Sequence, residues 1–172
     1  MNLWDFLKSQ FNSPAKVTSG IAGSAAALAM AVNFIGGLEG LRTTSYKDVV
    51  GVWTYCYGET QGAKPGQTYT VAQCDALLKT DILTYESQLN GCISDAIEPK
   101  IPQSMKISLV SFAYNVGVPA ACGSTLMRFV NAGQFVQACN QLALWNRGGG
   151  RIIQGLVNRR VDEKALCLSD LK

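Results

Sequence analysis

Three residues that could act together in a chemical reaction stand close in the sequence. Glu39, Asp48 and Thr54 are spaced E-x8-D-x5-T in the stretch EGLRTTSYKDVVGVWTYCYGET. Hydrolysis of a glycosidic bond needs a proton donor for the leaving oxygen and a second group that activates water or stabilises the sugar cation. Two carboxyl groups meet both needs when their surroundings differ.

The surroundings expected for these residues differ in that way. Glu39 directly follows an apolar segment, where partial loss of water favours the protonated carboxyl that an acid needs. Asp48 lies in a polar turn, where a carboxylate stays ionised, and the hydroxyl of Thr54 is suited to hold the attacking water. The alternative is three solvated side chains, because acidic residues at helix ends and in turns are mostly exposed. The spacing alone does not decide between the two interpretations.

The elements that must position these residues fall into two groups. Residues 43–68 are rich in Tyr, Val, Trp, Thr and Gly with short alternating runs, which predicts a small antiparallel sheet. Thr70 and Gln73 form a capping box that opens a helix ending at Gly91. Further helices are expected at residues 102–117, 124–133, 135–145 and about 156–168, with a flexible glycine loop at 148–150. A β lobe followed by a helical lobe is an α+β layout with a cleft between the lobes.

The segment at residues 17–38, VTSGIAGSAAALAMAVNFIGGL, carries no charge and follows Lys8 and Lys16. It is long enough to span a bilayer, which takes about 20 residues, but only eight of its 22 residues are large and apolar. It can be a cleaved signal peptide, a helix packed inside a soluble protein, or an uncleaved weak anchor. The flanking lysines favour the anchor, which would leave everything after Leu38 outside the inner membrane.

The composition of the chain excludes several classes of function. A chain of 172 residues fits one domain, and its +3 net charge comes from 15 basic and 12 acidic residues without a basic run. We therefore expect no nucleic-acid partner. The absence of His excludes His-based triads and the commonest zinc sites, so we expect neither metal nor cofactor, and we expect a monomer.

The six cysteines are an even number spread along the chain, as expected for disulfides formed in an oxidising compartment. The alternative is six buried thiols in a cytosolic protein. Among the fifteen pairings that six cysteines allow, we expect Cys56–Cys74, Cys92–Cys122 and Cys139–Cys167.

The stretch at residues 39–60 resembles the active-site segment of the phage lysozymes, the endolysins of glycoside hydrolase family 24. Further matches follow in the family's order: SLVSFAYNVGVPAACGSTLMRFVNAG resembles its cleft helix and the next helix, ACNQLALW its Trp helix, and GLVNRRVDEKALCL its C-terminal helix with paired arginines. The resemblance covers about residues 33–170. It implies a lysozyme-like α+β fold with a small antiparallel β lobe and a larger helical lobe.

The resemblance also implies roles for individual residues. Glu39 would be the general acid, Asp48 the carboxylate that activates or orients water, and Thr54 its partner. The reaction would be hydrolysis, with inversion, of the β-1,4 bond between N-acetylmuramic acid and N-acetylglucosamine in peptidoglycan. Asn115 and Arg159 fall where the family has a sugar-contacting amide and a C-terminal basic residue, which implies substrate binding.

One position departs from the family pattern. Many members have Gly-His after the catalytic strand, whereas this sequence has Gly58-Glu59. The contact between that His and a carboxylate, which ties the two lobes, cannot form here. We expect a changed pH dependence of stability and unchanged chemistry.

The uncharged segment resembles the signal-anchor-release segment found in endolysins of some phages of Gram-negative bacteria. This implies a basic cytoplasmic segment at residues 1–16, a releasable anchor at 17–38 and a muramidase domain at 39–172. The enzyme would be inactive at the inner membrane and would pass into the periplasm when the anchor refolds onto it. Two alternatives stay open: a membrane-tethered domain that binds peptidoglycan without cutting it, and a transglycosylase that uses the same acid without water.

Overall fold

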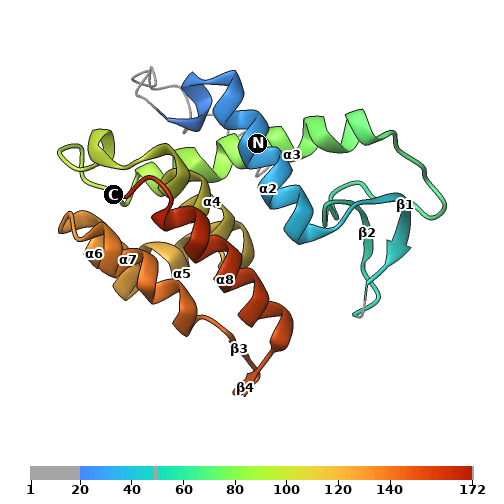
Figure 1. Cartoon of the computed structure of the whole chain (residues 1–172). Helices are drawn as coiled ribbons and strands as arrows, with labels where there is room; N and C mark the ends of the chain where they lie inside the picture. Colours follow the sequence, from blue (N-terminus) through green and yellow to red (C-terminus); the bar gives the residue numbers. More distant parts are fainter. Residues whose placement is uncertain (1–19, 49, 172) are drawn as a thin grey trace, which may run out of the picture.

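The protein has a small β lobe and a larger helical lobe joined by one long helix, in a computed structural model that describes residues 20–48 and 50–171 (Figure 1). The expected cytoplasmic segment at residues 1–16 lies outside the described residues, as do residues 17–19 of the expected anchor. The two-lobed α+β arrangement confirms the fold class expected from the sequence.

Most of the uncharged segment forms the first elements, η1 (Ile21–Gly23) and α2 (Ala25–Glu39). Ser24 caps α2, because its Oγ accepts a hydrogen bond from the Ala27 amide at 3.2 Å. Gly40 ends the helix with a φ of 77°, a value that glycine adopts without strain. The buried side of α2 packs against α3 (Val71–Asn90) and α4 (Gln103–Val116). Its residues are Ala27, Ala31, Val32, Ile35 and Gly36. Among the described residues, no helix combines the length and hydropathy needed to cross a membrane.

The β lobe begins directly after α2. Strands β1 (Arg42–Lys47) and β2 (Trp53–Cys56) pair antiparallel with Tyr46 opposite Thr54, and Thr44 forms a bridge to Thr68. This confirms the sheet expected within residues 43–68. The guanidinium of Arg42 lies 4.5 Å from the centre of the Tyr46 ring, so this arginine braces the first strand.

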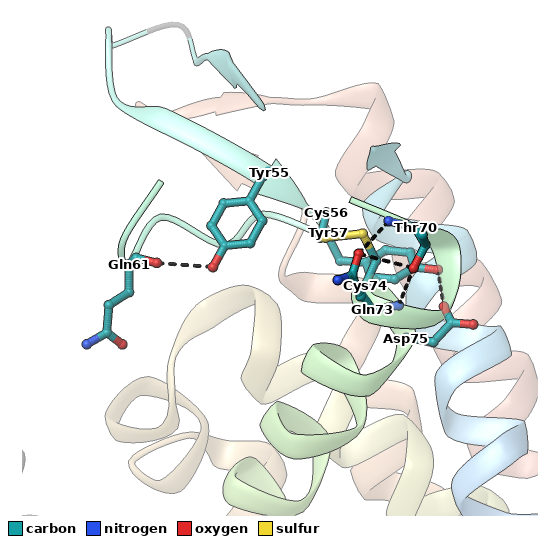
Figure 2. The surroundings of a disulfide bond; sticks show 8 residues. All are labelled: Tyr55, Cys56, Tyr57, Gln61, Thr70, Gln73, Cys74 and Asp75. Atoms are coloured by element: carbon teal, nitrogen blue, oxygen red, sulfur yellow. Dashed lines mark hydrogen bonds between the residues drawn. A yellow bond between two sulfur atoms is a disulfide. The ribbon is translucent and has the colours of Figure 1, made fainter. Parts of the chain in front are cut away.

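Helix α3 (Val71–Asn90) runs from the β lobe into the helical lobe (Figure 1). The capping box is confirmed: the Gln73 amide donates to Thr70 Oγ1 at 3.2 Å and the Thr70 amide donates to Gln73 Oε1 at 2.8 Å. Figure 2 shows this first turn beside the Cys56–Cys74 disulfide, which bonds the end of β2 to α3. The β lobe is thus covalently attached to the helix that carries it.

The helical lobe is built around α4 (Gln103–Val116), of whose fourteen residues ten are buried. Helices α2 and α3 pack against it, as do α5 (Val118–Cys122) and α8 (Gln154–Leu168). The remaining elements of this lobe are η2 (Glu98–Lys100), α5 (Val118–Cys122), α6 (Thr125–Asn131), α7 (Phe135–Gln141), η3 (Leu142–Leu144) and α8 (Gln154–Leu168).

Two local expectations were wrong. The helix expected over residues 135–145 ends at Gln141 and continues as the 3₁₀ turn η3. The glycines at 148–150 are not a flexible loop but the turn of a short hairpin, β3 (Arg147–Gly148) with β4 (Arg151–Ile152). Gly149 and Gly150 have φ values of 56° and 77°, which a two-residue hairpin turn requires.

All six cysteines are paired in the way expected. The disulfides join Cys56 to Cys74, Cys92 to Cys122 and Cys139 to Cys167. The first crosses from the β lobe to α3, and the third joins α7 to α8. Each disulfide reduces the conformational entropy of the unfolded chain and so stabilises the folded state.

Candidate active site

A pocket of about 450 Å³ lies between the β lobe and helices α3 and α4. Its walls are acidic and aromatic, a combination that suits a neutral, hydroxyl-rich ligand because carboxyl groups bind hydroxyls and rings bind the apolar faces of sugars. The acidic and aromatic side chains that line it are Glu39, Tyr57, Glu59, Asp81, Tyr85 and Tyr114. The pocket is the cleft expected between the lobes.

Glu39 reaches this pocket from the last turn of α2 and is fixed there by an arginine. Its Oε1 atom accepts a hydrogen bond from Arg159 Nη1 at 2.7 Å, and its side chain is 20% exposed. Glu39 is thus partly shielded from water, and its immediate neighbour is a charged group that the sequence did not indicate. A guanidinium from α8, 120 residues further along the chain, lies directly beside the carboxyl group.

Arg159 is itself held rigidly, because its side chain is only 8% exposed and is bonded on three sides. Besides Glu39, it donates from Nε to Glu163 Oε1 at 2.9 Å and from Nη2 to the Ser111 carbonyl at 3.0 Å. Arginine suits this place since its planar fork can donate in several fixed directions at once. These contacts point to a positioning role for Arg159 beneath Glu39, while the expected contact with substrate stays a prediction.

Glu163 is the centre of the network below the cleft. Its carboxylate accepts from Arg159, from Arg160 and from Ser111 Oγ at 2.7 Å, and it is completely buried. Arg160 also donates to Asn115 Oδ1. Burial lowers the pKa of Arg160 from its ordinary value, and the charge of Glu163 opposes that shift. Asn115 stands exposed at the end of α4, and its expected sugar contact stays a prediction.

Asp48 and Thr54 are brought together by the backbone of Val52. Asp48 Oδ1 accepts from the Val52 amide at 2.8 Å and from the Val50 amide at 3.0 Å. The Val52 carbonyl in turn accepts from the Asp48 amide at 2.9 Å and from Thr54 Oγ1 at 3.1 Å. One oxygen of the Asp48 carboxylate is thus held in place, and the buried Thr54 hydroxyl has its hydrogen committed to a carbonyl.

The rest of the hairpin connects this pair to the pocket. β2 leads from Thr54 into residues 57–61, which line the cleft. Tyr57 is anchored through its hydroxyl, which donates to Asp75 Oδ1 at 2.7 Å (Figure 2). Burial, and then that hydrogen bond, raises the pKa of Tyr57 to about 12. This hydrogen bond fixes the Tyr57 side chain in the wall of the cleft, whereas Asp48 and Thr54 lie on the same hairpin outside the residues that line the pocket.

A second pair of carboxyl groups, which no pattern in the sequence marks as a pair, lies in the same pocket. Glu59 follows β2 and forms a bridge with Tyr55, while Asp81 lies on α3. Burial raises the pKa of Glu59 to about 8, with further contributions from a hydrogen bond to Asp81 and from the charge of Asp81. The raised pKa of Glu59 favours its protonated form near neutral pH, and a proton shared with Asp81 in this hydrogen bond links the β lobe to α3.

The tyrosines around this pair respond to its charge. Burial first, and the charges of Glu59 and Asp81 next, raise the pKa of Tyr114 and of Tyr85 above the ordinary value. The only sequence signal for this feature was the Glu in place of His at position 59. Nothing local marked Asp81, because its role depends on how α3 lies against the β lobe. Within the described ranges, no group of three potential metal ligands occurs.

A cleft between a small β lobe and a helical lobe, with one carboxyl group at the end of the first long helix and another on the β hairpin, defines a lysozyme-like glycoside hydrolase. A model of the phage lysozyme family matches residues 36–163. The chain belongs to that family, and the fold class and the enzyme class expected from the sequence are confirmed.

Individual relatives agree with this membership. The chain is 46% identical over 133 residues to a SAR-endolysin of Bacteriophage PS119, which covers 77% of each chain. It is 44% identical over 133 residues to the SAR-endolysin of Enterobacteria phage P21, covering 77% of this chain and 78% of that one. The structure matches the active form of the P1 phage endolysin Lyz with a TM-score of 0.71 and 29% identity, over 83% of this chain and 84% of that chain.

The Arg159 network yields a test of how Glu39 is positioned. We expect Arg159→Lys to lower kcat about a hundredfold, because a lysine cannot bind Glu39, Glu163 and the Ser111 carbonyl at once. The free energy of unfolding should fall by about 3 kcal/mol, since buried carboxylates lose a partner. Arg151→Lys, on the exposed hairpin, is the matched control. Equal kcat values for the two variants would show that Arg159 does not position Glu39.

The shared proton predicts a pH dependence of stability. Because the pKa of Glu59 is raised in the folded state from 4.5 to about 8, its contribution is present below pH 4.5 and is lost as pH rises to about 8. We expect the free energy of unfolding to fall by about 1–2 kcal/mol across this window, after discounting for the solvent exposure of the pair. Urea denaturation at a series of pH values measures it.

Glu59→Gln is the matched variant for this measurement. The amide cannot titrate but can still donate a hydrogen bond to Asp81. The free energy of unfolding should therefore no longer change with pH between pH 4.5 and about 8, and most of the stability near neutral pH should be kept. A variant with the same slope as the natural protein would assign the slope to other groups.

Proposed function

We propose that this protein is an endolysin that hydrolyses the β-1,4 bond between N-acetylmuramic acid and N-acetylglucosamine in peptidoglycan. The observation that carries the proposal is the fixed placement of Glu39 in the cleft by Arg159, together with the fixed carboxylate of Asp48 on the adjoining hairpin. Membership in the phage lysozyme family supports the same reaction.

The geometry supports a role for each oxygen of the two carboxyl groups. Arg159 engages Oε1 of Glu39, which leaves Oε2 to carry the proton that passes to the glycosidic oxygen. Two amides engage Oδ1 of Asp48, which leaves Oδ2 to accept a proton from the attacking water. The hydroxyl hydrogen of Thr54 points to the Val52 carbonyl, so its oxygen can accept the other hydrogen of that water.

These roles give a balanced single displacement. Water attacks the anomeric carbon of the muramic acid from the Asp48 side, and Asp48 takes the proton that the water loses. The bond to the glucosamine oxygen breaks, and that oxygen receives the proton of Glu39. Attack opposite the leaving group inverts the anomeric centre, and solvent restores both carboxyl groups to their starting states.

The uncharged N-terminal segment adds a form of control. We assign residues 1–16 to a cytoplasmic segment, 17–38 to a releasable inner-membrane anchor and 39–172 to the muramidase domain. Because α2 packs on α3 and α4 and ends at Glu39, drawing this segment into a bilayer removes Glu39 from Arg159 and inactivates the enzyme. The SAR-endolysin relatives support this assignment. The protein is then held inactive at the inner membrane and acts in the periplasm after release, as a monomer.

The first test separates hydrolysis from mere binding. Glu39→Gln should lower kcat about 10²–10⁴-fold, because the amide cannot donate a proton to the leaving oxygen. Clearing of cells with permeabilised outer membranes measures the rate, and sedimentation with purified peptidoglycan measures binding, which the variant should keep. Asp162→Asn on the exposed face of α8 is the control. Equal clearing by the natural protein and Glu39→Gln, or none from either, would count against hydrolysis by this site, and binding without clearing would favour the non-catalytic binding domain.

The products of the same reaction decide between hydrolysis and transglycosylation. Hydrolysis consumes water and leaves reducing muramic acid ends, whereas a transglycosylase would leave anhydro ends, which mass spectrometry of the fragments distinguishes. We expect reducing ends only.

The second test concerns the membrane. We expect full-length protein to move from the membrane fraction to the periplasmic fraction when the membrane potential of expressing cells is collapsed, because a segment with few large apolar residues is held weakly in lipid. Gel mobility of the released protein measures whether the segment is kept. A shorter periplasmic product would instead identify a cleaved signal peptide.

A further inference from the structure

Glu86 is a buried carboxyl group that the proposed reaction does not use. It lies on α3 with 6% of its surface exposed, and it bonds to backbone far away in the sequence. Oε1 accepts from the Ile21 amide at 2.5 Å, and Oε2 accepts from the Ala22 amide at 3.0 Å. These two amides belong to the turn η1, directly before α2. The first N–H groups of a helical turn lack partners within it, so one carboxylate satisfies both.

The three residues at this point fit Glu86 closely. Ile21 is completely buried in the core. A Cβ atom added to Gly20 would lie 2.5 Å from Oε1 of Glu86, so a side chain there would push the carboxylate out of its present position. The backbone of Gly20 is extended, with φ −80° and ψ −178°, which any residue adopts. Glycine at position 20 therefore leaves space for the Glu86 carboxylate and is not needed for its own conformation.

The first half of α2 gives little information about register, because its buried residues there are Ala27 and Ala31, and small side chains fit a neighbouring helix in more than one position. The larger buried contacts, at Ile35 and Gly36, lie near the end of the helix. A slip of one helical turn would displace Glu39 by about 5.4 Å, beyond hydrogen-bonding reach of Arg159. A directional contact near the start of α2 adds a polar constraint on register that a slipped helix cannot satisfy.

We propose that Glu86 is a positioning residue that captures the Gly20-Ile21-Ala22 turn when the N-terminal segment leaves the membrane, and so sets the register in which Glu39 meets Arg159. The inference rests on the membrane release that belongs to the proposed function. While the segment lies in the bilayer, Glu86 is without both donors. Return of the turn restores two charge-assisted hydrogen bonds and buries Ile21, and the rigid α2 carries that position to Glu39.

The test is a double-mutant cycle on the full-length protein, with Gly20→Ala and Glu86→Ala made singly and together. Each single variant should lower kcat at least tenfold with KM unchanged, because fewer molecules hold Glu39 in register while those that do are normal. Gly20→Ala should have no further effect when Glu86 is already Ala, because the atom it would collide with is gone. Glu86→Gln keeps one acceptor oxygen, so its kcat should lie between the kcat of Glu86→Ala and that of the natural protein.

Matched controls remove simpler explanations. Gly37→Ala adds the same methyl group to the same segment, where nothing lies within 4 Å of the added atom, so it reports any effect of a more apolar anchor. Gln88→Ala alters an exposed position of α3 beside Glu86. Both controls should retain the natural kcat.

Hydrogen exchange gives a readout that a general loss of stability would not produce. The amides of Ile21 and Ala22 should lose protection in Glu86→Ala while the amides of α4 keep theirs. Protected Ile21 and Ala22 amides in Glu86→Ala, or an equal effect of Gly20→Ala in both backgrounds, would overturn the proposal. Hydrogen exchange measures directly whether Glu86 binds the Gly20-Ile21-Ala22 turn. If the natural protein instead had no lytic activity, or no membrane-bound pool, the proposed function itself would be wrong.

Discussion

The ion pair between Arg159 and Glu39 is the contact on which the candidate site depends. It joins the last residue of the N-terminal helix to the buried centre of the helical lobe, at 2.7 Å. Arg159 cannot follow Glu39 if that residue moves, because Glu163 and Ser111 hold its other nitrogens. The core of α4 and α8 therefore dictates where the carboxyl group must stand, and a helix that fails to dock leaves Arg159 without one of its two carboxylate partners.

Helix α2 is consequently fixed at both ends by polar contacts and along its length by small apolar ones. Glu86 bonds the turn before it, and Arg159 bonds its last residue. A segment that must suit both lipid and a protein core cannot be rich in large apolar side chains, since these would hold it in the bilayer. The alanines and glycines weaken the binding of this segment to lipid and its packing against the protein core. The polar contacts at the two ends of α2 then favour the docked state.

Local sequence signals were sufficient for much of the fold. The capping box at Thr70, the glycine that ends α4 and the alternating strands each act within a few neighbouring residues. The environment of Glu39 was not predictable in this way, because Arg159 approaches from 120 residues away. The β3–β4 hairpin was missed for another reason. Its strands are two residues long, too short for any alternation to appear.

The cleft also shows how neighbouring carboxyl groups acquire different roles. Glu39 and Glu59 line one pocket, yet a guanidinium lies beside the first and the carboxyl group of Asp81 beside the second. Were Glu59 ionised, its charge would lie beside that of Asp81 and the two would repel one another. The proton held between Glu59 and Asp81 removes one of these charges and links the lobes at the same time. Where many family members tie the lobes with a histidine and a carboxylate, this chain uses two carboxyl groups, whose bond weakens as pH rises and not as it falls.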